Sequence, residues 1–142
     1  MKTEIKQKWF YSQSPEEVWL YLTDPDLIAL WLMPNDFKPL LGHDFTFRIN
    51  PVPSLNLDGI FHCKILEIIP SKKLIYSWMG KSENNEIIMD TIVEWTLEKK
   101  DNGTELHLLH TGFKEANIAI FDSMTDGWMK KLEQIGNLLN EK

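Results

Sequence analysis

The chain has 142 residues, with 15 lysines and arginines against 21 aspartates and glutamates, and a formal net charge of -6 at pH 7. This length suits a single domain over residues 1–142, large enough to bury about two thirds of its unfolded surface without disulfides or metals. The acidic balance disfavours a nucleic-acid partner, while the lone Cys63 and the lack of any apolar run of membrane-spanning length predict a cytoplasmic protein without intramolecular disulfides or membrane spans.

The N-terminal part predicts one strand followed by two short helices. Residues 5–11 are rich in aromatic side chains, which favour β-strands. Ser14-Pro15-Glu16-Glu17 is typical of a helix start, because the serine hydroxyl accepts from the Glu17 amide and proline fits the first turn. Capping and the helix dipole therefore explain the two adjacent glutamates without any catalytic role. Asp24-Pro25-Asp26 repeats the start signal for a second helix.

Between residues 36 and 113 the apolar residues alternate with polar ones, as in β-strands with one wet face. Asp101-Asn102-Gly103 supplies residues that tolerate positive φ, a strong hairpin signal. The other gaps are also short enough for hairpins, so we expect an antiparallel sheet. Its strands are predicted at 45–47, 59–69, 74–78, 87–97 and 104–113.

Residues 118–140 predict one long helix that organises the chain. At about 1.5 Å per residue this helix spans roughly 34 Å and crosses the whole domain. Lys131 is expected outside its apolar stripe, and Gly127 inside the helix suggests close approach of another element or a local bend. The stripe recurs at steps of three and four residues and consists of Phe121, Met124, Trp128, Leu132, Ile135 and Leu139.

Several short patterns, in their order and spacing, carry a family resemblance over nearly the whole chain. They are Ser14-Pro15-Glu16-Glu17-Val18-Trp19, Asp24-Pro25 followed by Trp31, Gly42, Gly59, residues 65–70 and 74–78, Gly103-Thr104-Glu105-Leu106, His110-Thr111-Gly112-Phe113 and Gly127-Trp128. Together they resemble the START-related (SRPBCC) superfamily, in the branch homologous to the activator of the heat-shock-protein-90 ATPase. The resemblance implies an α+β helix-grip fold: a curved antiparallel sheet of about six strands, wrapped around a long C-terminal helix, with two short helices after the first strand. It also implies a mostly apolar cavity but no fixed chemistry, since members bind lipids, hormones or polyketides and a minority are enzymes.

The usual catalytic and metal-binding arrangements do not fit the predicted strands. His107 and His110 are three residues apart on one strand, so their side chains point to opposite faces and cannot share a metal ion. The adjacent His62 and Cys63 likewise diverge and cannot form a nucleophile and base pair. Cys63 is most simply a small core residue. We expect no catalytic residue, no metal and no cofactor.

Five side chains form the candidate ligand site. Aromatic residues at core spacing are first of all packing material, yet six tryptophans in 142 residues would also suit the wall of an apolar cavity. His110 lies on the predicted inner face, either as a buried, hydrogen-bonded histidine or as the polar group that orients a ligand. The candidate residues are Trp78, Trp95, His110, Met124 and Trp128.

Two functions of different classes follow from these observations. The first is a small-molecule binding module that holds a hydrophobic ligand, such as a lipid, between the sheet and the final helix, with a weak or family-specific enzyme as a variant of this interpretation. The second is a protein-interaction module, a co-chaperone-like domain with a protein partner on its outer surface. A sizeable cavity favours the first, whereas a filled core with an exposed apolar patch favours the second.

Overall fold

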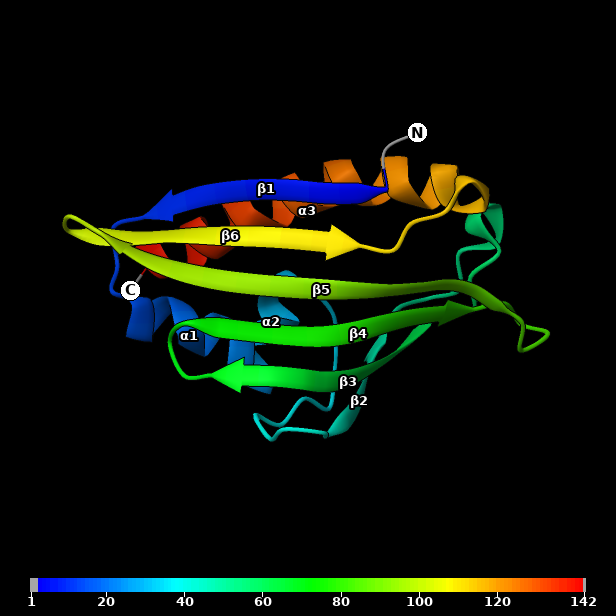
Figure 1. Ribbon diagram of the computed structural model, residues 1–142, viewed down its shortest axis with the longest axis horizontal. Helices are drawn as coiled ribbons and strands as arrows, with labels where there is room; N and C mark the ends of the chain where they lie inside the picture. The colour runs from blue at the N-terminus through cyan, green and yellow to red at the C-terminus, as the bar shows by residue number, and fades with distance from the viewer. Residues whose placement is uncertain (1–2, 142) are drawn as a thin grey trace.

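The computed structural model describes residues 3–141, in which a six-stranded sheet carries the helices on one face (Figure 1). Neighbouring strands are antiparallel throughout, in the order β1-β6-β5-β4-β3-β2. Strands β2 to β6 follow one another as hairpins, and β1 joins the sheet beside β6. The predicted antiparallel sheet is confirmed. Its strands are β1 (Glu4–Tyr11), β2 (Asp44–Arg48), β3 (Ile60–Ile69), β4 (Lys73–Lys81), β5 (Ile87–Lys100) and β6 (Gly103–Thr111).

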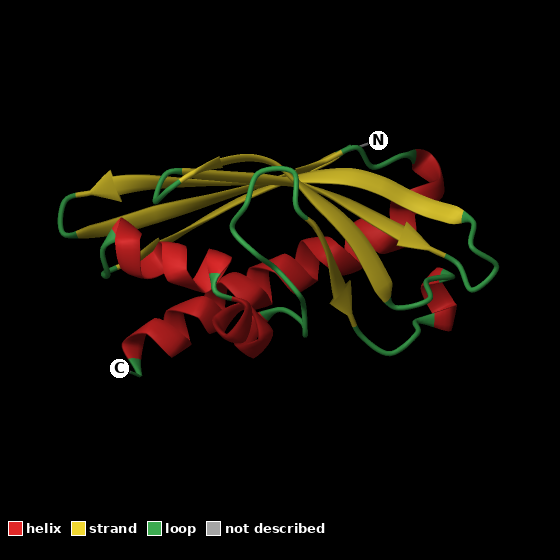
Figure 2. Cartoon of the chain, turned by 90° about the horizontal axis from the view of Figure 1, so that it is seen from below, coloured by secondary structure: helices red, strands yellow, loops and turns green. Residues whose placement is uncertain are grey.

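Three α-helices and two 3-10 turns complete the fold: α1 (Pro15–Thr23), α2 (Pro25–Trp31), η1 (Pro53–Leu55), η2 (Glu115–Asn117) and α3 (Ile118–Asn140). Figure 2 shows α3 crossing the concave side of the curved sheet, with α1 and α2 on that same side. The predicted α+β helix-grip architecture is confirmed, including the bounds of the long helix. No helix within residues 3–141 combines the length and apolarity needed to cross a bilayer.

The two short helices begin where their caps predict. The Ser14 hydroxyl accepts a hydrogen bond from the Glu17 amide at 3.3 Å. Asp24 ends α1 and begins α2, and its carboxylate accepts from the Asp26 amide at 2.9 Å. Because each cap satisfies amides that have no partner within the helix, both starts are fixed locally.

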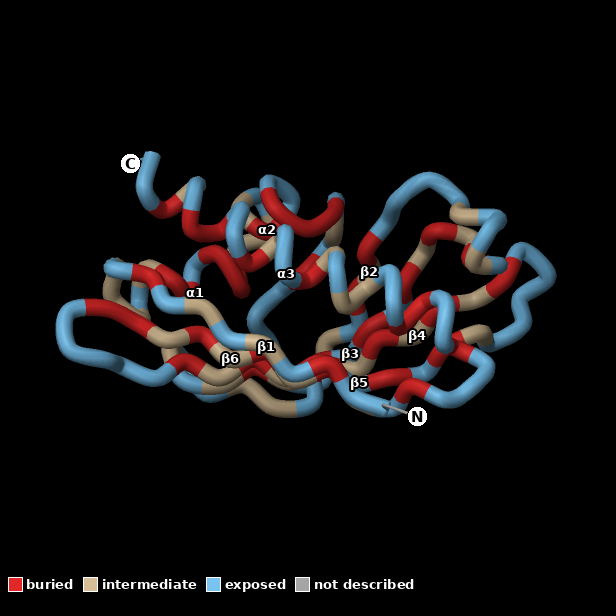
Figure 3. The backbone as a smooth tube through the Cα atoms, turned by 90° about the horizontal axis from the view of Figure 1, so that it is seen from above, coloured by how far each residue is buried: buried red, intermediate tan, exposed pale blue. Residues whose placement is uncertain are grey.

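The core lies between the concave face of the sheet and α3. Residues alternate between buried and partly buried along β4 and most of β6, as the red and tan segments of the tube in Figure 3 show. Trp128 of α3 makes edge contacts with Trp78 of β4 and Trp95 of β5, with ring centroids 5.8 and 5.5 Å apart. Trp31 of α2 meets Trp95 from the other side at 5.9 Å. These rings join the helices to the sheet.

The strand β3 departs from simple alternation at one point. Ile65 pairs with Tyr76 and Glu67 pairs with Ile75, so Leu66 is an extra residue on one side of the ladder. Before this β-bulge Phe61, Cys63 and Ile65 are buried in alternation with exposed residues, and after it no residue of β3 is fully buried.

Candidate ligand-binding pocket

A pocket of about 250 Å³ lies between α3, the inner face of the sheet and the segment that joins β2 to β3. The helix α3 contributes Ile120, Ser123, Met124, Gly127, Trp128 and Lys131. The connecting segment contributes Ile49, Val52, Leu55 and Leu57. The remaining wall consists of Leu32 and Met33 after α2, Phe61 of β3 and Trp78 of β4.

The connection between β2 and β3 is folded so that its apolar side chains cover the pocket. Val52 and Leu57 pair as an isolated bridge around the turn η1, and the Val52 amide donates to the Leu57 carbonyl at 2.9 Å. Asn56 closes the turn with φ at 56°, a left-handed conformation that asparagine tolerates. Leu57 is thereby buried. The sequence predicts only the strands on either side of this segment, although its apolar residues Val52, Leu55 and Leu57 are a signal that it also covers the core.

The structure divides the five candidate ligand residues into two groups. Trp78, Met124 and Trp128 line the pocket. Trp95 and His110 are fully buried and are not among the lining residues. They lie behind the pocket wall, in contact with Trp128.

His110 is the centre of a buried chain of hydrogen bonds. The indole of Trp128 can only donate, so its Nε1–H at 3.1 Å makes His110 Nδ1 the acceptor. The proton of the neutral ring is therefore on Nε2, which donates to the Thr91 hydroxyl at 2.7 Å. Thr91 in turn donates to the Trp78 carbonyl at 2.9 Å. Every group in this chain has a consistent role, and both ring nitrogens of His110 have protein partners.

Burial keeps the His110 ring neutral. Desolvation lowers the pKa of His110 from 6.5 to about 3. Its ring contacts are the aromatic side chains of Trp78, Phe113 and Trp128, none of which supplies a negative charge. A second proton on Nδ1 would also face the Trp128 N–H donor, so protonation would break the hydrogen bond that joins sheet and helix.

Trp78 provides a fixed aromatic surface within the pocket wall. Its ring is held by Phe47 and Phe61, each with a centroid distance of 5.0 Å. Within residues 3–141 its indole N–H has no hydrogen-bond acceptor, although the side chain is fully buried. The wall thus contains one unpaired donor beside apolar atoms.

Two residues of α3 differ from their predicted surroundings. Of the two explanations expected for Gly127, close approach of another element is wrong: apart from the helix's own backbone and the adjacent residues, no described atom lies within 4 Å of a Cβ placed there, and Gly127 lines the pocket instead. The missing side chain leaves open volume at this point of the wall. Lys131, expected outside the apolar stripe, is partly buried in the same wall, and desolvation lowers its pKa.

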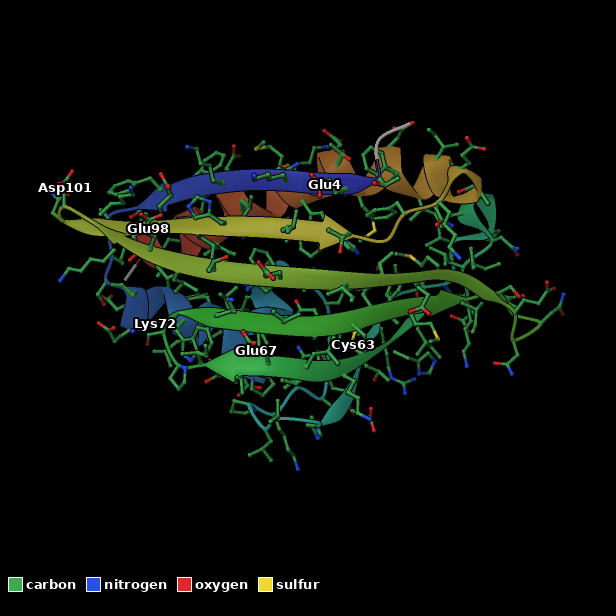
Figure 4. All side chains as sticks on the ribbon, viewed as in Figure 1. Glu4, Cys63, Glu67, Lys72, Glu98 and Asp101 are labelled. Atoms are coloured by element: carbon green, nitrogen blue, oxygen red, sulfur yellow. The ribbon has the colours of Figure 1, made fainter. Side chains whose placement is uncertain are left out.

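The outer face of the sheet carries a separate polar cluster that sequence analysis missed. Potential ligand atoms of Glu98, Glu105 and His107 lie within 4.8 Å of one another. Figure 4 shows Glu98 near Asp101, at the end of the β5–β6 hairpin. His107 Nε2 lies 2.8 Å from Glu105, and Glu98 forms an ion pair with the Lys100 ammonium at 3.1 Å, so contacts among neighbouring side chains account for the cluster. His107 and His110 do point to opposite faces, as predicted.

Cys63 is buried on the inner side of β3, as predicted for a core residue. Desolvation raises the pKa of its thiol, which keeps the sulfur protonated and unreactive.

A curved antiparallel sheet around a C-terminal helix, with an apolar pocket between them, defines a helix-grip domain of the START-related superfamily. The family described as "Activator of Hsp90 ATPase homolog 1-like protein" matches residues 12–140. The chain belongs to this family, and the predicted resemblance is confirmed. No functionally curated protein matches the sequence.

Solved structures with this fold extend over nearly the whole chain. Protein MLL2253 from Mesorhizobium loti is 29% identical with a TM-score of 0.85, and the match covers 98% of both chains. CalU16 from Micromonospora echinospora is 26% identical with a TM-score of 0.73, covering 94% of this chain and 73% of CalU16. The Aha1 dimer from Colwellia psychrerythraea is 20% identical with a TM-score of 0.78, covering 96% of this chain and 95% of that one, and this likeness concerns the fold alone.

Proposed function

We propose that the protein is a binding module for a small, largely apolar molecule, held in the pocket between α3, β4 and the β2–β3 connection. The observation that carries this proposal is the composition of the wall, in which Ser123 and Lys131 are the only polar side chains among those that line the pocket within residues 3–141. Burial of apolar ligand surface at about 25 cal/mol per Å² supplies the affinity. A mostly apolar wall with few polar groups is the usual composition of small-molecule sites.

The proposal assigns different roles to the five candidate residues. Trp78, Met124 and Trp128 contact the ligand, with two rigid rings and one adaptable side chain. His110 and Trp95 position Trp128 from behind, through a hydrogen bond and an edge contact.

The volume limits the size of the ligand. At about 250 Å³ the pocket is slightly smaller than the common range of roughly 300 to 1,000 Å³. The ligand is therefore a small compound or the end of a longer chain. We also propose a cytoplasmic location, in keeping with a single, buried cysteine.

Gly127 offers a test that changes the pocket without disturbing the packing around it. Gly127→Leu fills the open volume, whereas Gly127→Ala adds only one methyl group and serves as the matched control. Titration of planar and aliphatic hydrophobes, followed by tryptophan fluorescence, should show micromolar binding to the wild type and the alanine variant. The leucine variant should bind at least about tenfold more weakly, since its side chain occupies pocket volume that the ligand would otherwise fill. If no compound binds, or if Gly127→Leu changes nothing, the pocket is not a binding site.

The second candidate is a protein-interaction module, favoured by the family description and by two adjacent exposed leucines. Leu40 and Leu41 lie before β2 with 60% and 70% of their surface exposed. A partner that covers them would bind a Leu40→Ser, Leu41→Ser variant more weakly, while ligand binding in the pocket would be unaffected. Light scattering of the two forms tests the simplest such partner, a second copy of the chain.

A further inference from the structure

Lys131 is the one cationic side chain that lines the pocket, within the part of the chain that the structure describes. It is partly buried, and no described carboxylate forms an ion pair with it. The preceding Lys130 is different: it is exposed and its ammonium lies 3.2 Å from the Asp126 carboxylate. The pocket wall therefore includes a lysine whose charge no described carboxylate neutralises.

The spacing along α3 explains why Lys131 lacks a partner. On a helix, the side chains three and four residues away are the ones that can form an ion pair. For Lys131 those positions are held by Gly127, Trp128, Gln134 and Ile135, none of which is acidic. Helical side chains lean toward the N-terminus, which is the direction of Gly127 from Lys131, and both residues line the pocket.

The second polar side chain in the wall is on the same helix. Ser123 lies four residues before Gly127, and Lys131 lies four residues after it, so the three residues follow one another along one face of α3. Hydroxyl and ammonium groups both donate hydrogen bonds to an anionic oxygen. The apolar residues of the β2–β3 connection and Trp78 form the rest of the enclosure.

We propose that the pocket selects an amphipathic monoanion, with a carboxylate at Lys131 and a compact hydrocarbon body against Trp78, Met124 and the β2–β3 connection. This inference rests on the proposed function and names its ligand class. A partly buried ammonium has lost part of its hydration. A bound carboxylate compensates for this loss through a charge-assisted hydrogen bond. Burial also lowers the pKa of Lys131, in keeping with a desolvated charge that gains from an anionic partner.

Three ligands with the same eight-carbon chain test the charge preference by calorimetry: octanoate, 1-octanol and octylamine. The wild type should bind octanoate about tenfold more tightly than octanol, the size expected for a hydrogen bond to a charged group, and octylamine most weakly. Lys131→Met keeps the apolar stem and removes the charge, so it should abolish the preference for octanoate over octanol. Lys131→Arg should retain the preference. Lys130→Met, which removes a lysine outside the pocket, should behave as the wild type.

The possible results separate this inference from the proposed function. If octanol binds the wild type as tightly as octanoate, or if Lys131→Met keeps the preference, the assignment of the carboxylate to Lys131 is wrong although the apolar pocket stands. If Lys130→Met and Lys131→Met weaken octanoate equally, general surface charge explains the effect and the inference fails. If none of the three ligands binds and the wider panel of hydrophobes also fails, the proposed function is wrong as well.

Discussion

Trp128 of the long helix donates its indole N–H to His110 Nδ1 of the last strand at 3.1 Å, and this bond determines which ring nitrogen of the neutral histidine carries the proton. Because Nδ1 is the acceptor, Nε2 carries the proton of the neutral ring and donates a hydrogen bond to the Thr91 hydroxyl. The same chain ends on the backbone of Trp78, so the two tryptophans of the pocket wall are linked through a neutral imidazole. The geometry of the pocket thus depends on a residue that does not line it.

The stability of the protein should depend on pH through His110. Its folded pKa is about 3, whereas an unfolded histidine titrates near 6.5, so between these values the unfolded state binds the extra proton. The contribution of His110 is fully present above about pH 6.5 and is lost as the pH falls toward 3. From about pH 7.5 to about pH 4.5 the loss should be roughly 2 to 3 kcal/mol. Urea denaturation across this range measures it.

His110→Gln is the matched control for that measurement. Glutamine offers one acceptor and one donor but does not titrate, so its free energy of unfolding should fall less over the same pH range. The carboxylates and the other histidines are the same in the wild type and in His110→Gln. Their contributions to the pH dependence of the unfolding free energy therefore cancel when the two proteins are compared. Parallel loss of stability in the two proteins would contradict the prediction.

Trp128 should be one of the most costly residues to truncate. Trp128→Ala removes a buried ring in contact with Trp78, Trp95 and His110, and should cost about 3 to 5 kcal/mol of unfolding free energy. Lys130→Ala, on the exposed side of the same helix, should stay within about 0.5 kcal/mol. Chemical denaturation midpoints compare them directly. Equal midpoints would mean that the packed face of α3 is misassigned.

Trp128→Phe separates the hydrogen bond from the packing. Phenylalanine keeps an aromatic ring but removes the donor, so His110 Nδ1 becomes a buried acceptor without a partner, at about 1 to 3 kcal/mol. Because that nitrogen then no longer faces a donor, the pKa of His110 should rise in this variant. An NMR titration of the histidine ring follows the change, and an unchanged pKa would show that burial alone controls it.

Gly127 should tolerate alanine with a gain in stability. Alanine is favoured over glycine inside a helix by about 0.5 to 1 kcal/mol, and a Cβ at this position meets no described atom within 4 Å. Thermal unfolding of Gly127→Ala should therefore shift upward. A downward shift would indicate that the backbone at this point needs the freedom of glycine.

Tyr11 should anchor the first strand to the middle of α3. Its buried hydroxyl donates to the Leu132 carbonyl at 2.7 Å, and burial raises its pKa above the usual range. Tyr11→Phe removes one hydrogen bond and leaves the ring in place, at a cost of about 1 kcal/mol. The exposed Ser12→Ala is a control expected to be neutral. Equal unfolding free energies for wild type and Tyr11→Phe would show that this bond adds nothing.

Local patterns were sufficient to predict the elements of this fold. The bounds of α3, the starts of α1 and α2 at Ser14 and Asp24, and the inward direction of His110 all follow from periodicity and capping, which act within a few residues of the chain. The antiparallel direction of neighbouring strands could be predicted in the same way, from the short connections between them.

The pocket depended on contacts between residues far apart in the sequence. Periodicity identifies the apolar side of a helix but not the edges of that side, so it could not predict that Gly127 and Lys131 line a pocket. Their place in the wall depends on how α3 packs against the β2–β3 connection. His110 was predicted to face inward, yet its partners Thr91 and Trp128 lie 19 and 18 residues away and belong to other elements. Whether such a side chain touches a ligand or completes a buried network is decided by the packing of helix against sheet, because that packing alone brings the donors and acceptors together.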